Sequence, residues 1–552
     1  MYVTNSTVNV LYFSSVATSN SSRAQFGAIN MRPTALLLLA RSVVSATVTA
    51  TIQTTKIVST IPAAFASFGW EMDGMIGLLS TMADPRFAAT AKHLAPAIIR
   101  VGGITGDWVR YVNLTGEATD TSYASTRNAE LSGYWPTSEG NLSLAMFKTL
   151  YDFVAAADLK MLFMLNELHG RNCQLPTPGC PACDHAWCEG AWDTSNVRDF
   201  LQTLHDAGMV GGEGPLYAFE LGNELISHLD PITNVEDIVE AAGIIQSIWS
   251  DVPVSKRPGL YAPSTDVCSS PAQLEIMRNI TNVSGVSGFT FHGYPGQSGT
   301  GSNNLTSLLL NSTWLRQGIM TGSDAVGCIS AWDAGPRAAG LELLLTESSS
   351  SWAVNLPPPA QNSFLHTFFT VAELGQYSMT GVGLVARWAF SEGSPFATIR
   401  KNDAADRFDV AADYWIILAQ KATSGSGVLA ASVPDDSGVL VYAVCGVAGA
   451  GAVTVSAVNP GASPVTLSLV TGDGSRIAQA PRTEWVFTAP SGNLSSLAPS
   501  LNGGPPLVMN DDASLPSAFA PATVMAGGAD IVLPPFSASY FTLTNANAAA
   551  CL

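Results

Sequence analysis

Short apolar runs that alternate with longer helical stretches along residues 61–424 constrain this chain more than any other feature. Such runs are typical of parallel strands buried on both faces, and apolar residues spaced three and four apart are typical of the helices that cover them. Repeated strand–helix units favour an α/β fold that closes into a (β/α)8 TIM barrel. The expected strands are Ala64–Gly69, Ala97–Val101, Lys160–Leu165 and Leu216–Leu221, and the expected helices are Pro85–Leu94, Met146–Ala157 and Val197–Ala207.

The pattern changes close to Ser424. Beyond it, helical spacing fades, and Gly, Pro, Ser and Thr punctuate short alternating runs, which is typical of an antiparallel β-sandwich. The sequence therefore predicts an N-terminal extension over residues 1–60, a barrel over 61–424 and a C-terminal β-sandwich over 425–552. The runs that predict the sandwich are Val439–Val444, Val453–Val458, Val465–Val470 and Ser539–Thr544.

The N-terminal extension has the features of a secretory signal. Met31-Arg32-Pro33 is followed by the apolar run Thr34–Ala40, and Val48-Thr49-Ala50 offers a cleavage site of small residues. Asn-X-Ser/Thr sequons recur along the chain, as they do in glycoproteins. We therefore expect a secreted, extracellular protein, or one delivered to the lysosome or vacuole. No other segment is long and apolar enough to predict a transmembrane helix.

Four of the eight cysteines crowd into one segment, Cys173, Cys180, Cys183 and Cys188, with His185 among them. Cys-X-X-Cys beside a histidine has the spacing of zinc ligands. In a secreted protein, however, clustered cysteines are more commonly joined as disulfides. A disulfide-stapled loop is the favoured interpretation, and a zinc site is the alternative.

The charge of the chain restricts its partners. The formal net charge is −18, and only 12% of the residues are charged whereas 47% are hydrophobic. A core-rich acidic protein lacks the clustered Lys and Arg that bind nucleic acid, so we expect no nucleic-acid partner. The same repulsion disfavours highly sulfated polyanions. A neutral or lightly charged glycan fits better.

Two segments place a glutamate where a buried strand ends. The first is Ala218–Leu225, which contains Asn223-Glu224, and in the second Leu343–Leu345 leads into Thr346-Glu347. In a (β/α)8 barrel the functional residues lie at the carboxyl ends of the strands. Glycoside hydrolysis needs two carboxyl groups there, one protonated to donate to the leaving oxygen and one ionised to attack the sugar or activate water. Glu224 and Glu347 are the candidates for this pair.

Other polar residues also follow the predicted strands. Glu71 and Asp73 come after the first strand, Asp107 after the Gly-Gly turn, and Asn166-Glu167 after the third strand. Such residues either line a sugar subsite or cap the next helix. We predict that Asp107 and Asn166 bind substrate.

Beyond the two glutamates, short motifs follow one another in order from about residue 60 to the C-terminus. With these motifs the chain resembles the heparanase family, glycoside hydrolase family 79, among the clan A retaining glycosidases. The motifs are Asp84-Pro85-Arg86-Phe87, Arg100-Val101-Gly102-Gly103, Glu220-Leu221-Gly222-Asn223-Glu224, His292-Gly293-Tyr294, Thr346-Glu347-Ser348-Ser349, Asp413-Tyr414-Trp415, Leu533-Pro534-Pro535-Phe536-Ser537 and Ala550-Cys551.

The resemblance implies a role for each matched residue. Glu347 would be the nucleophile and Glu224 the acid/base, with their carboxyl groups ~5–5.5 Å apart, as retaining chemistry requires. Asn223 would bond the sugar 2-hydroxyl, Tyr294 would hold the nucleophile, and His292 would belong to the same substrate site. The resemblance also implies a Cys445–Cys551 disulfide. No metal or organic cofactor is expected, because both carboxylates come from the chain.

The activity implied by the resemblance is that of a retaining endo- or exo-β-glucuronidase acting on a glucuronide or on an extracellular or cell-wall glycan. Two segments depart from the family where it contacts the uronate carboxylate: Ser350–Asn355 lacks the glycine-rich loop, and Gly393–Phe396 lacks the tyrosine. A clan A glycosidase of other specificity, such as an arabinofuranosidase or xylosidase, is therefore one alternative. A non-catalytic homologue that binds a carbohydrate or a partner is the other. The sequence makes no prediction of the oligomeric state.

Overall fold

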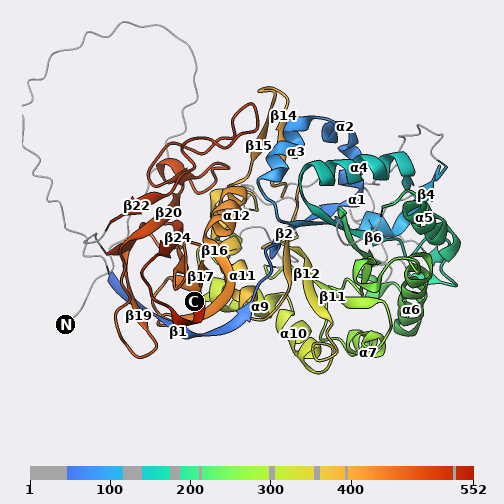
Figure 1. Ribbon diagram of the computed structural model, residues 1–552, viewed down its shortest axis with the longest axis horizontal. Helices are drawn as coiled ribbons and strands as arrows, with labels where there is room; N and C mark the ends of the chain where they lie inside the picture. Colours follow the sequence, from blue (N-terminus) through green and yellow to red (C-terminus); the bar gives the residue numbers. More distant parts are fainter. Residues whose placement is uncertain are drawn as a thin grey trace, which may run out of the picture. The chain divides into compact units, whose positions relative to one another are not determined.

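Eight parallel strands follow one another in chain order and close into a barrel (Figure 1). This is the closed parallel barrel that the sequence predicts. The computed structural model describes residues 46–115, 140–174, 187–209, 214–296, 305–352, 361–391, 396–525 and 530–552. The barrel strands are β2 (Ala66–Glu71), β3 (Ile98–Gly102), β6 (Lys160–Leu165), β9 (Leu216–Leu221), β10 (Gly259–Tyr261), β11 (Val286–Gly293), β12 (Glu342–Ser348) and β13 (Leu384–Trp388).

Helices connect the barrel strands, and their sequences carry the expected signals. α5 begins after Asp193, whose carboxylate accepts from the Ser195 backbone N–H, and it buries Phe200 and Leu204 four residues apart. In the described part of the chain, no helix has the length and apolar character needed to cross a membrane. The helices are α1 (Met72–Gly77), α2 (Leu79–Met82), α3 (Pro85–Lys92), α4 (Leu144–Ala156), α5 (Thr194–Asp206), α6 (Pro231–Ile248), α7 (Pro271–Ile280), α8 (Leu305–Leu309), α9 (Ile319–Gly322), α10 (Ala325–Asp333), α11 (Thr367–Ser378) and α12 (Ala412–Thr423).

Apolar side chains fill part of the barrel interior. They form one buried cluster to which six of the eight strands contribute. A barrel packed in this way is a core and not a pore, which leaves the carboxyl ends of the strands to form the site. The buried members of the cluster are Ile98, Leu162, Ala218, Tyr261, Leu344, Leu384 and Ala386.

A second sheet has ten strands, nine of them in the order β21-β20-β24-β18-β17-β16-β1-β19-β23, with β22 paired to β20. The predicted sheet-rich C-terminal region is confirmed, whereas its division into the two layers of a sandwich stays a prediction. One pair, β1 with β19, is parallel, so the expectation of a wholly antiparallel sheet is wrong at this point. The strands are β1 (Ala46–Thr60), β16 (Ser424–Ser432), β17 (Leu440–Gly446), β18 (Val453–Asn459), β19 (Val465–Thr471), β20 (Arg482–Thr488), β21 (Ser500–Leu501), β22 (Ala522–Val524), β23 (Ile531–Leu533) and β24 (Ser537–Leu543).

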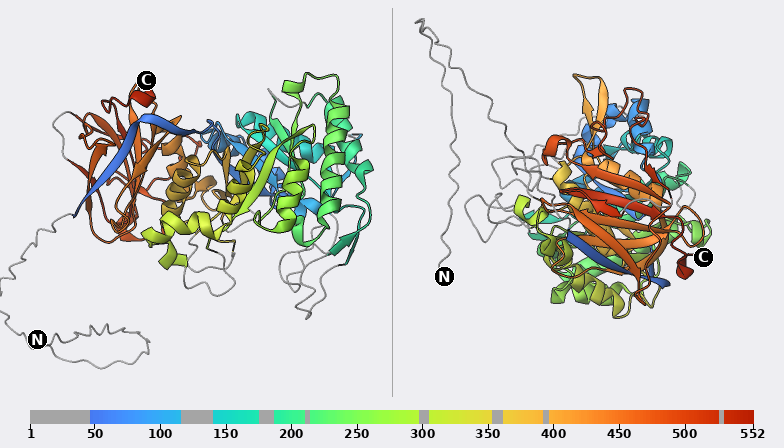
Figure 2. Two further views of the ribbon diagram at one scale, coloured as in Figure 1. Left: turned by 90° about the horizontal axis from the view of Figure 1, so that it is seen from below. Right: turned by 90° about the vertical axis from the view of Figure 1, so that its left-hand side faces the viewer.

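Strand β1 corrects the predicted N-terminal boundary. Its residues fall within the extension predicted over 1–60, yet it lies between β16 and β19, as the blue strand among the orange ones in Figure 2 shows. The buried positions Val48, Ala50, Ile52 and Thr54 alternate with exposed or half-buried ones, which is the period of a half-buried strand. The predicted cleavage site at Val48-Thr49-Ala50 therefore lies inside a paired strand. The extension ends before Ala46.

Three disulfides join described cysteines. Cys445–Cys551 confirms the predicted pair. Cys173–Cys188 links β7 (Asn172–Gln174) to β8 (Trp187–Glu189), so two of the four clustered sulfurs are unavailable to a metal; Cys180, Cys183 and His185 lie outside the described residues. The third disulfide, Cys268–Cys328, was not predicted. Two further strand pairs are β4 (Val109–Val112) with β5 (Gly140–Ser143) and β14 (Ile399–Asn402) with β15 (Arg407–Val410).

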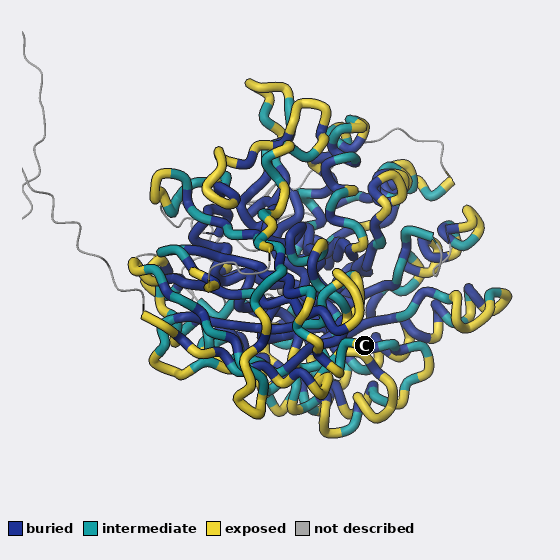
Figure 3. Tube along the Cα trace, turned by 60° about the vertical axis from the view of Figure 1, so that its left-hand side comes forward, coloured by how far each residue is buried: buried dark blue, intermediate teal, exposed yellow. Residues whose placement is uncertain are grey.

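Helix α11 is buried over its whole length. It follows barrel strand β12 and contacts β17, β18 and β24 of the second sheet. Figure 3 shows that such dark, buried segments run through the interior, while exposed residues gather in the loops. A helix enclosed on all sides can carry polar side chains only if they are bonded, which makes the polar residues of α11 informative.

Candidate active site

Glu224 stands in a strained turn directly after β9. Its φ of 55° lies in the left-handed region, which non-glycine residues seldom adopt, and Gly222 before it has a φ of 67°. The turn is held because the Glu224 backbone N–H donates to the Ser264 carbonyl at 2.8 Å. The Glu224 side chain remains 27% exposed. Strain of this kind is retained where the surroundings fix a side chain in a required direction.

Glu347 lies near the end of β12, at the same end of the barrel as Glu224. Arg100 Nη1 donates to Glu347 Oε2 at 2.9 Å, and the Tyr294 hydroxyl donates to Glu347 Oε1. One carboxylate oxygen of Glu224, one of Glu347 and a ring nitrogen of His292 all lie within 4.8 Å of one another. The predicted pair of glutamates therefore meets at the carboxyl ends of β9 and β12.

Arg100, from the middle of β3, connects the two glutamate segments. Its side chain is fully buried, and its Nε donates to Glu220 Oε2 at 2.6 Å. Its Nη2 donates to Asn223 Oδ1 at 2.8 Å and to Ser264 Oγ at 3.0 Å. A buried guanidinium is stable only when its donors are used, and here they fix both sides of the site. Sequence reasoning did not assign Arg100 a role, although a charge within the apolar run Ile98–Val101 is a signal for one.

The two glutamates differ in the groups that surround their carboxylates. Burial raises the pKa of Glu224 to about 7, and Arg100 opposes this rise. Burial also raises the pKa of Glu347, but the charge of Arg100 nearby, together with the bond from Tyr294, opposes the rise. Groups that donate to a carboxylate favour its ionised form. Glu347 is therefore suited to be the ionised partner, and Glu224 is suited to carry a proton near neutral pH.

His292 contacts the acid/base candidate and not open solvent. It is 1% exposed; its Nδ1 lies 2.6 Å from Glu224 Oε1, and its Nε2 lies 3.0 Å from Ser264 Oγ. Burial lowers the pKa of His292, so the ring is neutral at physiological pH. Both ring nitrogens are engaged within the protein. The histidine thus orients Glu224, and its predicted contact with the substrate stays a prediction.

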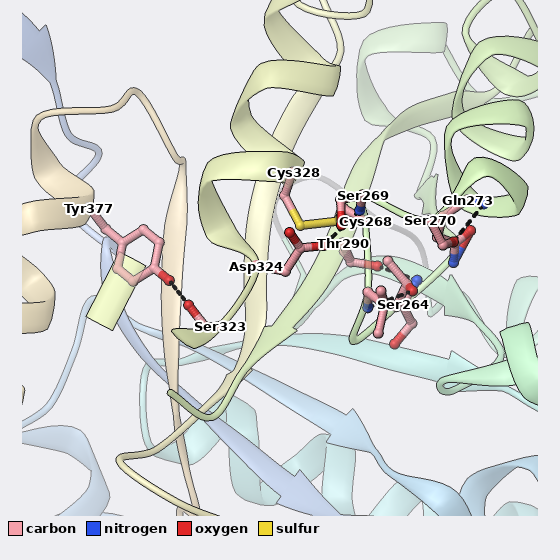
Figure 4. Close-up of a disulfide and its surroundings, with 12 residues drawn as sticks. Ser264, Cys268, Ser269, Ser270, Gln273, Thr290, Ser323, Asp324, Cys328 and Tyr377 are labelled. Atoms are coloured by element: carbon pink, nitrogen blue, oxygen red, sulfur yellow. Dashed lines mark hydrogen bonds between the residues drawn. A yellow bond between two sulfur atoms is a disulfide. The ribbon is translucent and has the colours of Figure 1, made fainter. Parts of the chain in front are cut away.

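The segment that carries Ser264 is anchored beneath the site. The Ser264 backbone N–H donates to Thr290 Oγ1 at 3.0 Å, and the disulfide Cys268–Cys328 joins the same segment to α10 (Figure 4). The Ser269 backbone N–H donates to Asp324 Oδ2 at 2.6 Å beside that disulfide. Because Ser264 accepts from both Arg100 and the Glu224 backbone, its fixed position helps to fix theirs.

Two predicted binding residues, Asn166 and Asp107, are buried and bonded within the protein. Asn166 is fully buried and donates to the Val109 carbonyl at 2.5 Å, while its own Oδ1 accepts from the Trp192 indole at 3.3 Å. Asp107 is 1% exposed and accepts from the Glu167 backbone N–H at 3.3 Å. Burial raises the pKa of Asp107 well above its ordinary value. Both residues stabilise the loops that surround the site.

Glu71, at the end of β2, contributes a third carboxyl group close to Glu347. Burial raises the pKa of Glu71 to about 8, with a further rise from neighbouring Asp73, while the Thr105 hydroxyl donates to Glu71 Oε1 at 2.7 Å. Gly103 makes this packing possible, because a Cβ there would stand 2.3 Å from Glu71 Oε2, and its φ is +92°. Sequence reasoning found Glu71 but left open whether it binds sugar or caps a helix.

Glu224, His292 and Glu347 are also the one set of described residues that could hold a metal ion. The Arg100 guanidinium, however, lies 2.9 Å from Glu347. A permanent cation at that distance repels a second one and occupies one of the carboxylate lone pairs. The donor set therefore fits a carboxylate pair better than a metal site.

Comparison with known sequences gives one family and several relatives. The family model described as "Glycosyl hydrolase family 79, N-terminal domain" matches residues 58–340. Heparanase of Mus musculus is 25% identical over 530 residues, which cover 86% of this chain and 88% of that protein. Heparanase of Gallus gallus is 25% identical over 534 residues, covering 85% and 91%. "Heparanase-like protein 2" of Arabidopsis thaliana is 27% identical over 199 residues, covering 35% and 33%.

Comparison with solved structures shows the shared fold. A 4-O-α-L-rhamnosyl-β-D-glucuronidase from Fusarium oxysporum aligns with a TM-score of 0.60 at 13% identity, covering 90% of this chain and all of the other. A family 51 α-L-arabinofuranosidase from Thermotoga petrophila aligns with the same score at 12% identity and the same coverage. At such identities the likeness concerns the fold alone.

Proposed function

The chain belongs to glycosyl hydrolase family 79, and from this premise we propose that it is a retaining β-glucuronidase, with Glu347 as nucleophile and Glu224 as acid/base. The observation that carries the proposal is the meeting of the two glutamates. One oxygen of each carboxylate lies within 4.8 Å of the other. So close an approach supports the retaining arrangement, with carboxyl groups ~5–5.5 Å apart, over the ~6.5–9.5 Å that leaves room for water in inverting enzymes.

In the first step, the ionised Glu347 attacks the anomeric carbon while Glu224 donates its proton to the leaving oxygen. Negative charge leaves Glu347 as the glycosyl–enzyme bond forms, so its bonds from Arg100 and Tyr294 orient the carboxylate and keep it ionised until then. Asn223 Oδ1 accepts from Arg100, so the amide N–H groups of Asn223 remain able to donate a hydrogen bond to the sugar 2-hydroxyl. Remote orientation of this kind lowers the entropic barrier to attack.

In the second step, Glu224 is a carboxylate and removes a proton from the incoming water, whose oxygen attacks the anomeric carbon and releases Glu347 as a carboxylate. The proton taken from water restores the acid form of Glu224 and completes the cycle. A pKa of about 7 lets the same group act as acid and then as base near neutral pH. The neutral His292, 2.6 Å from Glu224, holds the carboxyl group in one orientation through both steps.

The choice of a glucuronide rests on the family and on the charge state of Glu71. Glu71, beside Glu347, has a pKa of about 8, so at neutral pH it is an uncharged acid that does not repel a uronate. The name of the Fusarium protein, a glucuronidase, supports the same sugar class. The arabinofuranosidases with the same fold, and the departures at residues 350–355 and 393–396, favour the alternative of another sugar.

A panel of 4-nitrophenyl glycosides tests the proposal: the β-D-glucuronide, α-L-arabinofuranoside and β-D-xyloside. The glucuronide should be cleaved fastest, and Glu347→Gln should abolish its turnover. Glu342→Gln is a matched control, because Glu342 begins the same strand at the opposite end of the barrel. Preference for another glycoside would refute the sugar assignment while keeping the mechanism. No turnover of any glycoside, and no labelling of Glu347 by a 2-fluoroglycoside inactivator, would indicate a non-catalytic homologue.

We further propose that the enzyme works in a compartment of the secretory pathway or outside the cell. Three disulfides among the described residues support this, because they persist in oxidising environments. Expression in a eukaryotic secretory host should yield active enzyme in the medium, with a mass that falls after enzymatic removal of N-glycans. Retention of all activity inside the cell in unglycosylated form would argue against this location.

A further inference from the structure

Three serines directly after Glu347 are bonded to helix α11 and to the turn that precedes it. Ser348, Ser349 and Ser350 follow Glu347 and are fully buried. The Ser348 hydroxyl donates to Glu373, and His366 Nε2 lies 3.4 Å from both the Ser349 hydroxyl and the Ser350 backbone nitrogen. A buried polar stretch is stable only with such partners, so the backbone after Glu347 is placed by α11 and the turn before it.

The histidine is itself held by a buried ion pair. His366 Nδ1 lies 2.7 Å from Asp413 Oδ2, and Arg387 Nε donates to the same oxygen at 2.6 Å. Arg387 also donates to the carbonyls of Gln361 at 2.7 Å and Phe396 at 2.8 Å. The polar cluster therefore spans β12, α11, β13 and α12, with every charged member buried.

The hydrogen bonds fix the tautomer of His366. The Ser350 backbone N–H can only donate, so His366 Nε2 must accept and its proton must lie on Nδ1, directed at Asp413. Burial lowers the pKa of His366, which keeps the ring neutral in this role. Ser349, His366 and Asp413 thus have the connectivity of a hydrolase triad. Because all three are enclosed, no substrate can reach the serine, and the arrangement can serve only to hold the chain.

We propose that Glu373 and His366 are positioning residues for the nucleophile: by holding Ser348–Ser350 they keep the Glu347 carboxylate between Arg100 and Tyr294. Ser348 and Glu347 are adjacent on β12, so movement of one backbone moves the other. Glu347 depends on two directional donors, and a displacement of about 1 Å in an active site can cost on the order of 10²-fold in rate. This inference rests on the proposed role of Glu347.

The protonation state of Glu373 determines which substitutions test its role. Burial raises the pKa of Glu373 to about 8. The negative charge of Asp413 raises this pKa further, whereas the bond from Ser348 and the positive charge of Arg387 lower it. At neutral pH the side chain is an uncharged acid. Glutamine has the same shape and can still accept from Ser348, whereas leucine fills the space without accepting. Glu373→Gln should therefore preserve the position of the Glu347 carboxylate, whereas in Glu373→Leu the carboxylate should be displaced.

The test compares these two variants with Gln376→Leu, a matched control on the same helix. Gln376 is buried as well, but it donates to the Leu315 carbonyl, away from β12. With the aryl glycoside that the wild type cleaves, Glu373→Leu should lower kcat by about 10- to 100-fold with KM changed by less than about twofold. Glu373→Gln should recover most of kcat. Gln376→Leu should lower the unfolding temperature and leave kcat unchanged.

Gln376→Leu is expected to lose thermal stability and keep its kcat. If Glu373→Leu behaved in the same way, the positioning role would be overturned. A crystal structure of Glu373→Leu gives a readout that needs no substrate. The Glu347 carboxylate should have left the Tyr294 hydroxyl or Arg100 Nη1, and an unmoved carboxylate would also contradict the inference. If the wild type cleaves no glycoside, the proposed function fails, while the crystal structure still decides whether Glu373 positions Glu347.

Discussion

The alkaline limb of the pH–rate profile should report the proton on Glu224. With a pKa of about 7, about nine-tenths of the groups carry a proton at about pH 6 and about one-tenth at about pH 8. Because the acid form is needed for leaving-group departure, kcat/KM should fall about tenfold across this interval. At the ordinary value of 4.5, only about 3% would be protonated at about pH 6, so burial of Glu224 increases the amount of active acid about 30-fold there.

The assay measures kcat/KM between about pH 5 and about pH 9 for two glucuronides, one with a 4-nitrophenol leaving group and one with the more acidic 2,4-dinitrophenol. The second leaving group departs without a proton, so its alkaline limb should be much weaker. Glu224→Ala should lose about 10²–10⁴-fold in kcat/KM for the poorer leaving group and lose its alkaline limb, and azide should restore part of kcat for the better leaving group. A limb centred well below about pH 6, or an equal loss for both leaving groups, would refute the role of buried Glu224 as acid.

Three further predictions concern stability and are measured by urea unfolding. Arg100→Met should cost about 3–5 kcal/mol, because Glu220 would keep a buried charge without its partner; an unchanged midpoint would contradict this. The pKa of Asp413 is about 2 in the folded protein against an ordinary 3.8, so its ionised form adds about 2 kcal/mol to the free energy of unfolding. This contribution is complete above about pH 4 and is lost as the pH falls towards about 2. Asp413→Asn should remove that contribution at neutral pH together with this acid dependence, and a variant with the wild-type acid profile would disprove it. Replacing Cys445 and Cys551 together by alanine should cost about 2–4 kcal/mol, and equal stability under reducing and oxidising conditions in the wild type would argue against it.

The barrel strands could be predicted because parallel strands buried on both faces read as unbroken apolar runs. Lys160–Leu165 and Leu216–Leu221 form strands with the predicted bounds. Strand β1 was missed for the opposite reason. Its alternation of buried and exposed positions lies just after the apolar run 34–40, and small residues such as Val48 and Ala50 fit both a cleavage site and a strand. Pairing with strands more than 350 residues away decides between the two, and no local pattern contains that information.

The site could be predicted as far as its functional residues lie at the carboxyl ends of barrel strands. Glu224 and Glu347 come together as expected, whereas Asn166, also at a strand end, turns to the Val109 carbonyl. Position after a strand fixes the end of the barrel at which a residue lies but not the direction of its side chain. Ser264 and His366 carried no signal at all, since a serine or histidine gains its role only through neighbours distant in sequence.

The parallel pairing of β1 with β19 has a consequence for how the chain is made. β1 leaves the ribosome first among the described strands, yet its two partners, β16 and β19, emerge only after the entire barrel has been synthesised. Until then its buried face, with Ala50 and Ile52, has nothing to cover it, and contacts this distant are slow to form. A recombinant fragment that stops at the end of the barrel would carry a permanently unpaired, aggregation-prone strand. Expression of the barrel therefore requires the whole chain, because helix α11 is also buried against β17, β18 and β24 of the second sheet.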